Sequence, residues 1–208
     1  REVIHAREFA AAHMLAALHA VDRVGVGLGD EPATTPSDEL NRWERAFSTV
    51  ENTLSAGTAE CFAALRAALP SPMKDAVLHG DYRVGNMLCD GTRIAAVIDW
   101  EIWSVGDPRI DLAWFLLFGD PRHAAVRPAN PDMPSEAELL TMYETAAGSV
   151  VADLRWFEAL ARLKLAATVA LIAKNRLKHG PSDATSLRLR REVVPTAIAV
   201  ARDLLGCS

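Results

Sequence analysis

The chain has 208 residues, half of them hydrophobic and 24% charged, with a formal net charge of −5. This composition is typical of a folded globular protein and excludes a disordered, collagen-like or coiled-coil chain. The acidic balance provides no basic face to neutralise phosphates, and no apolar stretch reaches the roughly 20 residues that span a bilayer. We therefore expect neither a nucleic-acid nor a membrane partner. Three cysteines without metal-ligand spacing favour a reducing compartment, so we predict a cytoplasmic location.

The first third of the chain is predicted to be helical. Ala and Leu predominate up to about residue 21, which favours a helix there, and the glycines of residues 25–29 end it. Pro36 suits the first turn of a second helix, and apolar residues at steps of three and four extend that helix to about residue 54. A short helix is expected over residues 59–69.

The middle of the chain carries the β signals. Residues 76–79, 87–89 and 94–98 are short and apolar, as strands are. Asp90-Gly91 lies between the last two segments, and this dipeptide favours a hairpin turn. We therefore predict one small antiparallel hairpin here.

Helices return after the hairpin. We predict them over residues 108–118, 136–147, 153–179 and 183–205, and we expect Pro195 to kink or divide the last one. No repeat or linker divides the sequence. The predicted fold class is α+β, mainly α, with residues 1–208 forming a single unit.

The loop between the predicted strands carries the chemistry. It reads His79-Gly80-Asp81-Tyr82-Arg83-Val84-Gly85-Asn86, and Ile98-Asp99-Trp100-Glu101 follows the hairpin. If Cys89 pairs with Ile94, Asn86 falls opposite Val97 and Asp99 lies two residues further on the same face. An amide oxygen and a carboxylate at one end of a hairpin can bind Mg²⁺, which prefers oxygen ligands. Asp81 can face the same site without binding the metal.

A known spacing appears in this loop. His79-x-Asp81-x-x-x-x-Asn86 matches the catalytic loop of protein kinases, with Gly in place of Arg. Further motifs follow in the same order as in a known family. With them, the sequence resembles the aminoglycoside phosphotransferase/choline kinase family of the protein-kinase-like superfamily. These motifs are Leu15-Ala16-Ala17-Leu18-His19, Trp43, Asp99-Trp100-Glu101 and Gly106-Asp107-Pro108-x-x-Asp111-Leu112.

The resemblance implies a protein-kinase-like C-terminal lobe and an enzyme that moves the γ-phosphoryl group of ATP to a small-molecule hydroxyl. Asp81 would be the catalytic base, and Asn86 and Asp99 would bind Mg²⁺ that bridges the ATP phosphates. We expect the acceptor to lie in a cleft formed by the helical segments of about residues 22–60 and 119–150.

The resemblance also implies supporting residues around this loop. His79 would brace the loop, and Asp111 would tie down its backbone from a helix. Arg83, Glu101 and Asp107 lie inside the motifs without a definite role. Asp107 is adequately explained as a helix N-cap ahead of the following proline.

Part of the family pattern is missing. The first lysine is Lys74, so no upstream lysine can pair with ATP phosphates, and the glycines of residues 25–29 follow a helix rather than a strand. We therefore expect a C-terminal lobe that lacks the N-terminal β lobe.

A non-catalytic binding or regulatory module is the alternative to the enzyme. Two other readings are a plain polar loop beside a hairpin and, with less support, a metal-dependent hydrolase built on His79 and Asp81. The sequence gives no prediction of the oligomeric state.

Overall fold

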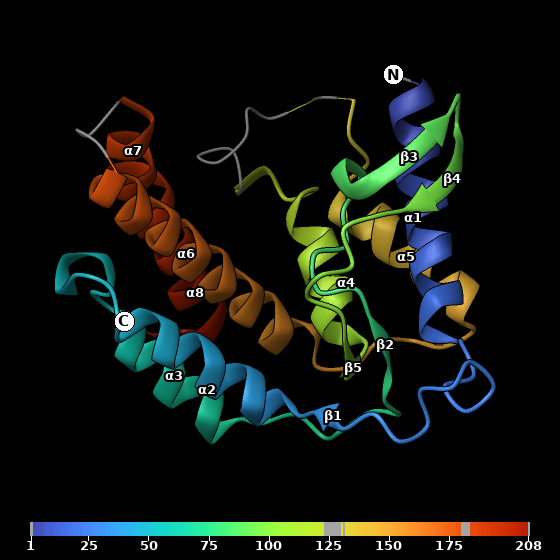
Figure 1. The fold of residues 1–208 in the computed structure, drawn as a ribbon, viewed down its shortest axis with the longest axis horizontal. Helices are drawn as coiled ribbons and strands as arrows, with labels where there is room; N and C mark the ends of the chain where they lie inside the picture. The colour runs from blue at the N-terminus through green and yellow to red at the C-terminus, as the bar shows by residue number, and fades with distance from the viewer. Residues whose placement is uncertain (1, 123–129, 131, 180–183, 208) are drawn as a thin grey trace. The chain divides into compact units, whose positions relative to one another are not determined.

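The computed structural model describes residues 2–122, 130, 132–179 and 184–207. Helices predominate and the strands are short, which confirms the predicted mainly α fold with a small antiparallel hairpin (Figure 1). The helices are α1 (Glu2–His19), α2 (Pro36–Phe47), α3 (Thr58–Ala67), α4 (Arg109–Leu117), α5 (Glu136–Ala147), α6 (Leu154–His179), α7 (Ala184–Arg188) and α8 (Val194–Leu205). The strands are β1 (Ala33–Thr34), β2 (Ala76–Leu78), β3 (Met87–Asp90), β4 (Arg93–Val97) and β5 (Ser104–Gly106).

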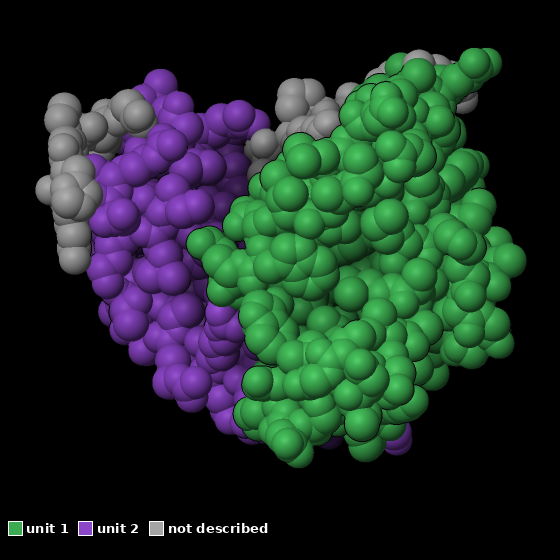
Figure 2. Space-filling model, turned by 45° about the vertical axis from the view of Figure 1, so that its right-hand side comes forward, with its two compact units in different colours: residues 1–35, 72–121, 129–154 green, residues 36–71, 122–128, 155–208 purple. Residues whose placement is uncertain are grey.

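The chain divides into two compact units, each assembled from separate stretches of sequence (Figure 2). Unit 1 takes residues 1–35, 72–121 and 129–154, and unit 2 takes residues 36–71, 122–128 and 155–208. Unit 1 therefore holds α1, α4, α5 and the strands. Unit 2 holds α2, α3, α7, α8 and all of α6 beyond its first residue.

The core of unit 1 lies where α1 and α5 pack together with α4 and the hairpin. Helix α5 begins with the predicted capping box, in which Ser135 and Glu138 bond reciprocally through side chain and backbone. It ends at Gly148, whose positive φ of 69° suits glycine. The buried cluster consists of Ala11, Ala12, Leu15, Ala16, Tyr82, Met87, Ile94, Leu112, Phe115, Leu116, Leu139 and Tyr143.

The hairpin of β3 and β4 confirms the predicted pairing of Cys89 with Ile94. The predicted position of Asn86 opposite Val97 is wrong, because Met87 pairs with Val97 instead. The register shifts between Leu88 and Cys89, and such a bulge places an extra residue on one strand. Asn86 consequently lies one residue further along, where its carbonyl accepts a bond from the Ile98 backbone N–H at 2.9 Å.

A second, three-stranded sheet has the order β1-β5-β2. Strand β5 is antiparallel to β2 and parallel to β1, which is only two residues long. A Cβ atom at Gly106 would lie 2.6 Å from the carbonyl oxygen of Thr34, so glycine is needed for the two strands to approach. This sheet places β2, which leads into the loop of residues 79–86.

Unit 2 is helical. The predicted helix over residues 36–54 is wrong at its end, because α2 stops at Phe47 and Asn52–Leu54 forms a separate 3-10 turn. The hydroxyls of Ser48 and Thr49 donate to carbonyl oxygens three residues back, which competes with helix propagation.

The predicted last helix is divided, as Pro195 led us to expect. A π-helical turn, Leu189–Val193, separates α7 from α8, and Pro195 lies in the first turn of α8. Asp183, its predicted start, lies outside the described residues. Neither α6 nor any other described helix is long and apolar enough to cross a bilayer.

Candidate active site

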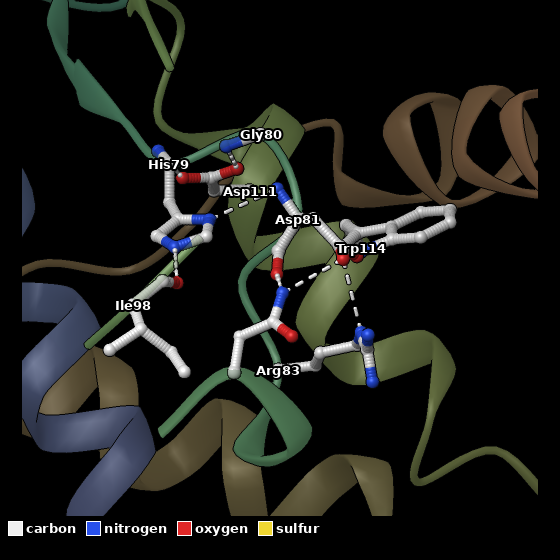
Figure 3. A network of polar contacts seen from close by, with 8 residues as sticks. His79, Gly80, Asp81, Arg83, Ile98, Asp111 and Trp114 are labelled. Atoms are coloured by element: carbon white, nitrogen blue, oxygen red, sulfur yellow. Dashed lines mark hydrogen bonds and ion pairs between the residues drawn. The ribbon is translucent and has the colours of Figure 1, made fainter. Parts of the chain in front are cut away.

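The loop of residues 79–86 joins β2 to β3 and is the centre of the candidate site (Figure 3). It ends in a 3-10 turn, Val84–Asn86, in which the Asn86 N–H donates to the carbonyl oxygen of Arg83 at 2.9 Å. The turn brings Asn86 back toward Asp81, five residues earlier. Both residues therefore lie in one short loop within unit 1.

Three donors hold the Asp81 carboxylate in one orientation. The Trp114 indole Nε1 donates to Oδ1 at 2.8 Å, while Asn86 Nδ2 and Arg83 Nε donate to Oδ2 at 2.8 and 3.1 Å. The carboxylate side chain nevertheless remains 24% exposed. A fixed but accessible carboxylate can accept a proton from a hydroxyl that approaches it.

Asp111 holds the backbone of the same loop. Its carboxylate, in the first turn of α4, is completely buried. Oδ2 accepts from the His79 backbone N–H at 2.5 Å, and Oδ1 accepts from the Gly80 N–H at 2.9 Å. These charge-assisted bonds fix the two residues immediately before Asp81.

His79 has a structural geometry and is fully buried. Its Nδ1 accepts from the Asp81 backbone N–H at 3.2 Å, and its Nε2 lies 2.9 Å from the carbonyl oxygen of Ile98. Because a backbone N–H can only donate, Nδ1 is unprotonated and Nε2 carries the proton. The ring also packs against Trp100 at 4.6 Å between centroids. Both ring nitrogens thus form hydrogen bonds, and through them His79 connects the loop to the segment after β4.

The segment that carries Asp99 lies against this loop. Asp99 has a φ of +69°, which is uncommon for a residue other than glycine. Gly80 also has a positive φ, and a Cβ atom there would lie only 2.5 Å from the carbonyl oxygen of Ile102. With the backbone bond between Ile98 and Asn86, this close contact brings residues 98–102 next to the loop.

The side-chain oxygens of Asn86 and Asp99 are of the kind that Mg²⁺ binds. Asn86 Nδ2 donates both to the carbonyl oxygen of Asp81, at 2.9 Å, and to its carboxylate. Its two amide hydrogens are therefore engaged, which leaves Oδ1 as the side-chain atom suited to a cation. Asp99 adds an exposed carboxylate one residue beyond Ile98, and magnesium prefers such oxygen ligands with water and phosphate completing the shell. Among the described residues, no three His, Cys, Asp or Glu side chains form a metal-binding group.

The motif residues without a definite role occupy different surroundings. Arg83 contacts Asp81 directly, whereas Glu101 is exposed in the turn that follows Trp100. Asp107 is buried in an ion pair with Arg109, with Nη2 and Oδ2 2.7 Å apart. Asp107 Oδ1 also accepts from the backbone N–H of Arg109 at 3.0 Å, the helix-capping contact that we predicted as its alternative role.

Two residues near the site were not singled out by the sequence. Trp114 lies in an apolar stretch of the predicted helix over residues 108–118, yet its indole N–H donates to Asp81; its position one turn beyond Asp111 on that helix is the available signal. The Tyr143 hydroxyl bonds His19 Nδ1 at 2.8 Å, and His19 Nε2 lies 3.9 Å from Asp111 Oδ2. Burial raises the pKa of Tyr143 to about 12, so this hydroxyl remains protonated at neutral pH.

The predicted acceptor segments meet only in part. Residues 22–24 and 29 line a pocket of about 820 Å³ together with Tyr143, Ala147 and Ser149. This pocket lies within unit 1 and is not lined by the loop of residues 79–86. Residues 36–60 belong to unit 2, and residues 123–129 and 131 lie outside the described part of the chain. The acceptor cleft stays a prediction.

Sequence comparisons relate this chain to larger proteins. Residues 2–160 match the sequence model of the phosphotransferase enzyme family. Acyl-CoA dehydrogenase family member 11 of Gallus gallus is 27% identical over 206 residues, covering 91% of this chain and 26% of that protein. The Homo sapiens protein of the same name is 30% identical over 131 residues, covering 58% of this chain and 17% of that protein. The chain thus spans about a quarter or less of these relatives.

Solved structures share the fold. A crystal structure described as a candidate aminoglycoside phosphotransferase from Ralstonia eutropha JMP134 has a TM-score of 0.79 at 23% identity, covering 97% of this chain and 65% of that one. A thermostable mutant of aminoglycoside phosphotransferase APH(4)-Ia, in ternary complex with ADP and hygromycin B, has a TM-score of 0.62 at 19% identity, covering 98% and 65%. These findings confirm the resemblance that the motifs predicted.

Proposed function

Because the chain belongs to the phosphotransferase enzyme family, we propose that it is part of an ATP- and magnesium-dependent enzyme that phosphorylates a hydroxyl of a small molecule. The observation that carries this proposal is the Asp81 carboxylate, held by three donors and still open to solvent beside Asn86. A fixed carboxylate next to a candidate metal ligand is the arrangement of the protein-kinase catalytic loop, in which an Asp accepts the hydroxyl proton and an Asn binds Mg²⁺.

In this proposal, Asp81 orients the acceptor hydroxyl and accepts its proton as the hydroxyl oxygen attacks the γ-phosphorus of ATP. Asn86 Oδ1 and the Asp99 carboxylate would hold Mg²⁺, which neutralises charge on the ATP phosphates when it is bound. Asp111 and His79 keep the loop backbone rigid, so that Asp81 does not need to reorganise during the reaction.

The acceptor is a small molecule with a free hydroxyl. Hygromycin B, the molecule bound in one structural neighbour, is one example of such an acceptor. The match to acyl-CoA dehydrogenase family members makes hydroxyacyl thioesters a second class of acceptor to test.

We also propose a cytoplasmic location, where the thiols of Cys61, Cys89 and Cys207 would stay reduced as they are in the structure.

The test is ATP consumption by the full-length protein that contains this chain, measured against aminoglycosides, choline-like alcohols, sugars and hydroxyacyl thioesters. Asp81→Asn should lower turnover at least about 100-fold while the protein remains folded, because positioned general bases contribute about 10²- to 10⁴-fold. Asp90→Asn, at the exposed last residue of β3, is the matched control and should leave turnover unchanged.

Unchanged turnover in Asp81→Asn rejects Asp81 as the base. If the wild-type protein consumes no ATP with any acceptor class, the alternative of a non-catalytic kinase-like module replaces the enzyme.

A further inference from the structure

Helix α4 reaches the candidate catalytic loop with two side chains one helical turn apart. Asp111 binds the loop backbone, and Trp114 binds the carboxylate of Asp81 itself (Figure 3). The Trp114 side chain is buried, with 6% of its surface exposed, and its ring packs edge-on against Phe118 at 5.5 Å between centroids. The indole is therefore fixed in place before any ligand binds.

The two oxygens of the Asp81 carboxylate have different partners. Oδ1 receives a buried indole N–H, which is a donor without any acceptor capacity. Oδ2 receives Asn86 Nδ2 and Arg83 Nε, and the Arg83 side chain is 40% exposed. An exposed donor is displaced more readily than a buried ring, so Oδ2 is the oxygen that an incoming hydroxyl can reach.

We propose that Trp114 is a positioning residue that locks Oδ1 of Asp81 and thereby assigns proton transfer to Oδ2. This role rests on the proposed phosphotransferase function. In the step, the acceptor hydroxyl displaces Arg83 from Oδ2, its oxygen forms a bond to the γ-phosphorus of ATP, and the bond from that phosphorus to ADP breaks. The hydroxyl proton moves to Oδ2, while Oδ1 keeps its bond to the indole.

Trp114→Phe tests the role, because phenylalanine keeps an aromatic ring beside Phe118 but removes the N–H donor together with part of the indole volume. In the full-length protein, kcat should fall about 10- to 100-fold, which corresponds to losing one hydrogen bond to a charged group. The KM values for ATP and acceptor should stay within about twofold, because neither binds through the indole.

Trp156→Phe is the matched control. Trp156 is similarly buried, at 7% exposed, and its indole N–H donates to the carbonyl oxygen of Leu65 at 2.9 Å within unit 2. This variant also loses one buried indole bond, so its stability should fall by a similar amount. Its kcat should stay unchanged, which separates positioning of Asp81 from a general loss of stability.

An NMR measurement does not depend on turnover or on the folding of Trp114→Phe. In protein labelled with ¹⁵N-tryptophan, Asp81→Asn removes the charged acceptor and should shift the Trp114 indole resonance, whereas the Trp156 resonance should not move. An unmoved Trp114 resonance, or wild-type kcat in Trp114→Phe while Asp81→Asn is inactive, overturns this proposal alone. Full turnover of Asp81→Asn overturns the proposed function and this role together.

Discussion

Gly80 is the position where a single added methyl group should test how tightly the candidate catalytic loop is packed. Its φ of +86° lies in the left-handed region, and an added Cβ would lie 2.5 Å from the carbonyl oxygen of Ile102. An ordinary contact needs about 3.5 Å, so the two backbones would have to separate by about 1 Å in Gly80→Ala. Asp81 is the next residue and would move with the loop.

Two separate effects should lower the free energy of unfolding in Gly80→Ala. Placing alanine in a left-handed conformation costs about 1–2 kcal/mol, and forcing an extra carbon into a packed contact costs about 1–3 kcal/mol more. We therefore expect Gly80→Ala to lower the free energy of unfolding by about 2–5 kcal/mol. A displacement of about 1 Å at a catalytic group costs about 100-fold in rate, so kcat should fall by that factor.

Gly91→Ala is the control that measures the effect of the left-handed backbone conformation alone. Gly91 has a φ of +59°, but a Cβ atom there would meet no other atom within 4 Å. Denaturant unfolding of the full-length protein should show a loss of about 1–2 kcal/mol for this variant, with unchanged phosphoryl transfer. Equal losses in both variants, or wild-type kcat in Gly80→Ala, would refute the argument that Ile102 constrains the loop.

Two further predictions concern buried groups of unit 1. Asp111→Asn should lower the free energy of unfolding by about 3–5 kcal/mol in a denaturant titration, because one of the two loop amides loses a charged acceptor and faces an amide donor instead; a loss below 1 kcal/mol would contradict this. Tyr143 should form no tyrosinate until the pH approaches its raised pKa of about 12, as measured by the absorbance difference at high pH between wild type and Tyr143→Phe. Because the folded pKa exceeds the ordinary value of about 10, this group stabilises the fold fully below pH 10 and loses that contribution between about pH 10 and 12. A difference spectrum that already appears at pH 10 in the folded protein would contradict this pKa.

The sequence predicted the hairpin and its turn because Asp90-Gly91 is a strong local signal. It did not predict the register beyond Cys89, because a bulge depends on packing between strands rather than on residue type. Strand β1 was missed for a related reason. Two residues are too short for any alternation to be visible, and β1 forms only by pairing with Val105 and Gly106, about 70 residues away.

The candidate site was predicted in part. Motif spacing identified Asp81, Asn86 and Asp111 before any geometry was known, because such a loop is defined by its order along the chain. The contact between Trp114 and Asp81 could not be predicted from the sequence, because the sequence of an apolar helix does not indicate whether the N–H of its tryptophan forms a hydrogen bond. The hydrogen bond between Tyr143 and His19 could not be predicted either, because the two residues lie on different helices and are 124 positions apart in the sequence.

Unit 1 is assembled from three separate stretches of sequence, and residues 36–71 of unit 2 lie between the first and the second of them. During synthesis, α1 is made more than a hundred residues before α5, so the part of its surface that packs on α5 stays uncovered until then. Long-range closure of this kind carries an entropic cost and slows folding. Newly made α1 must therefore remain soluble during this interval, and a premature stop before α5 would leave a fragment with an exposed helix surface that favours aggregation.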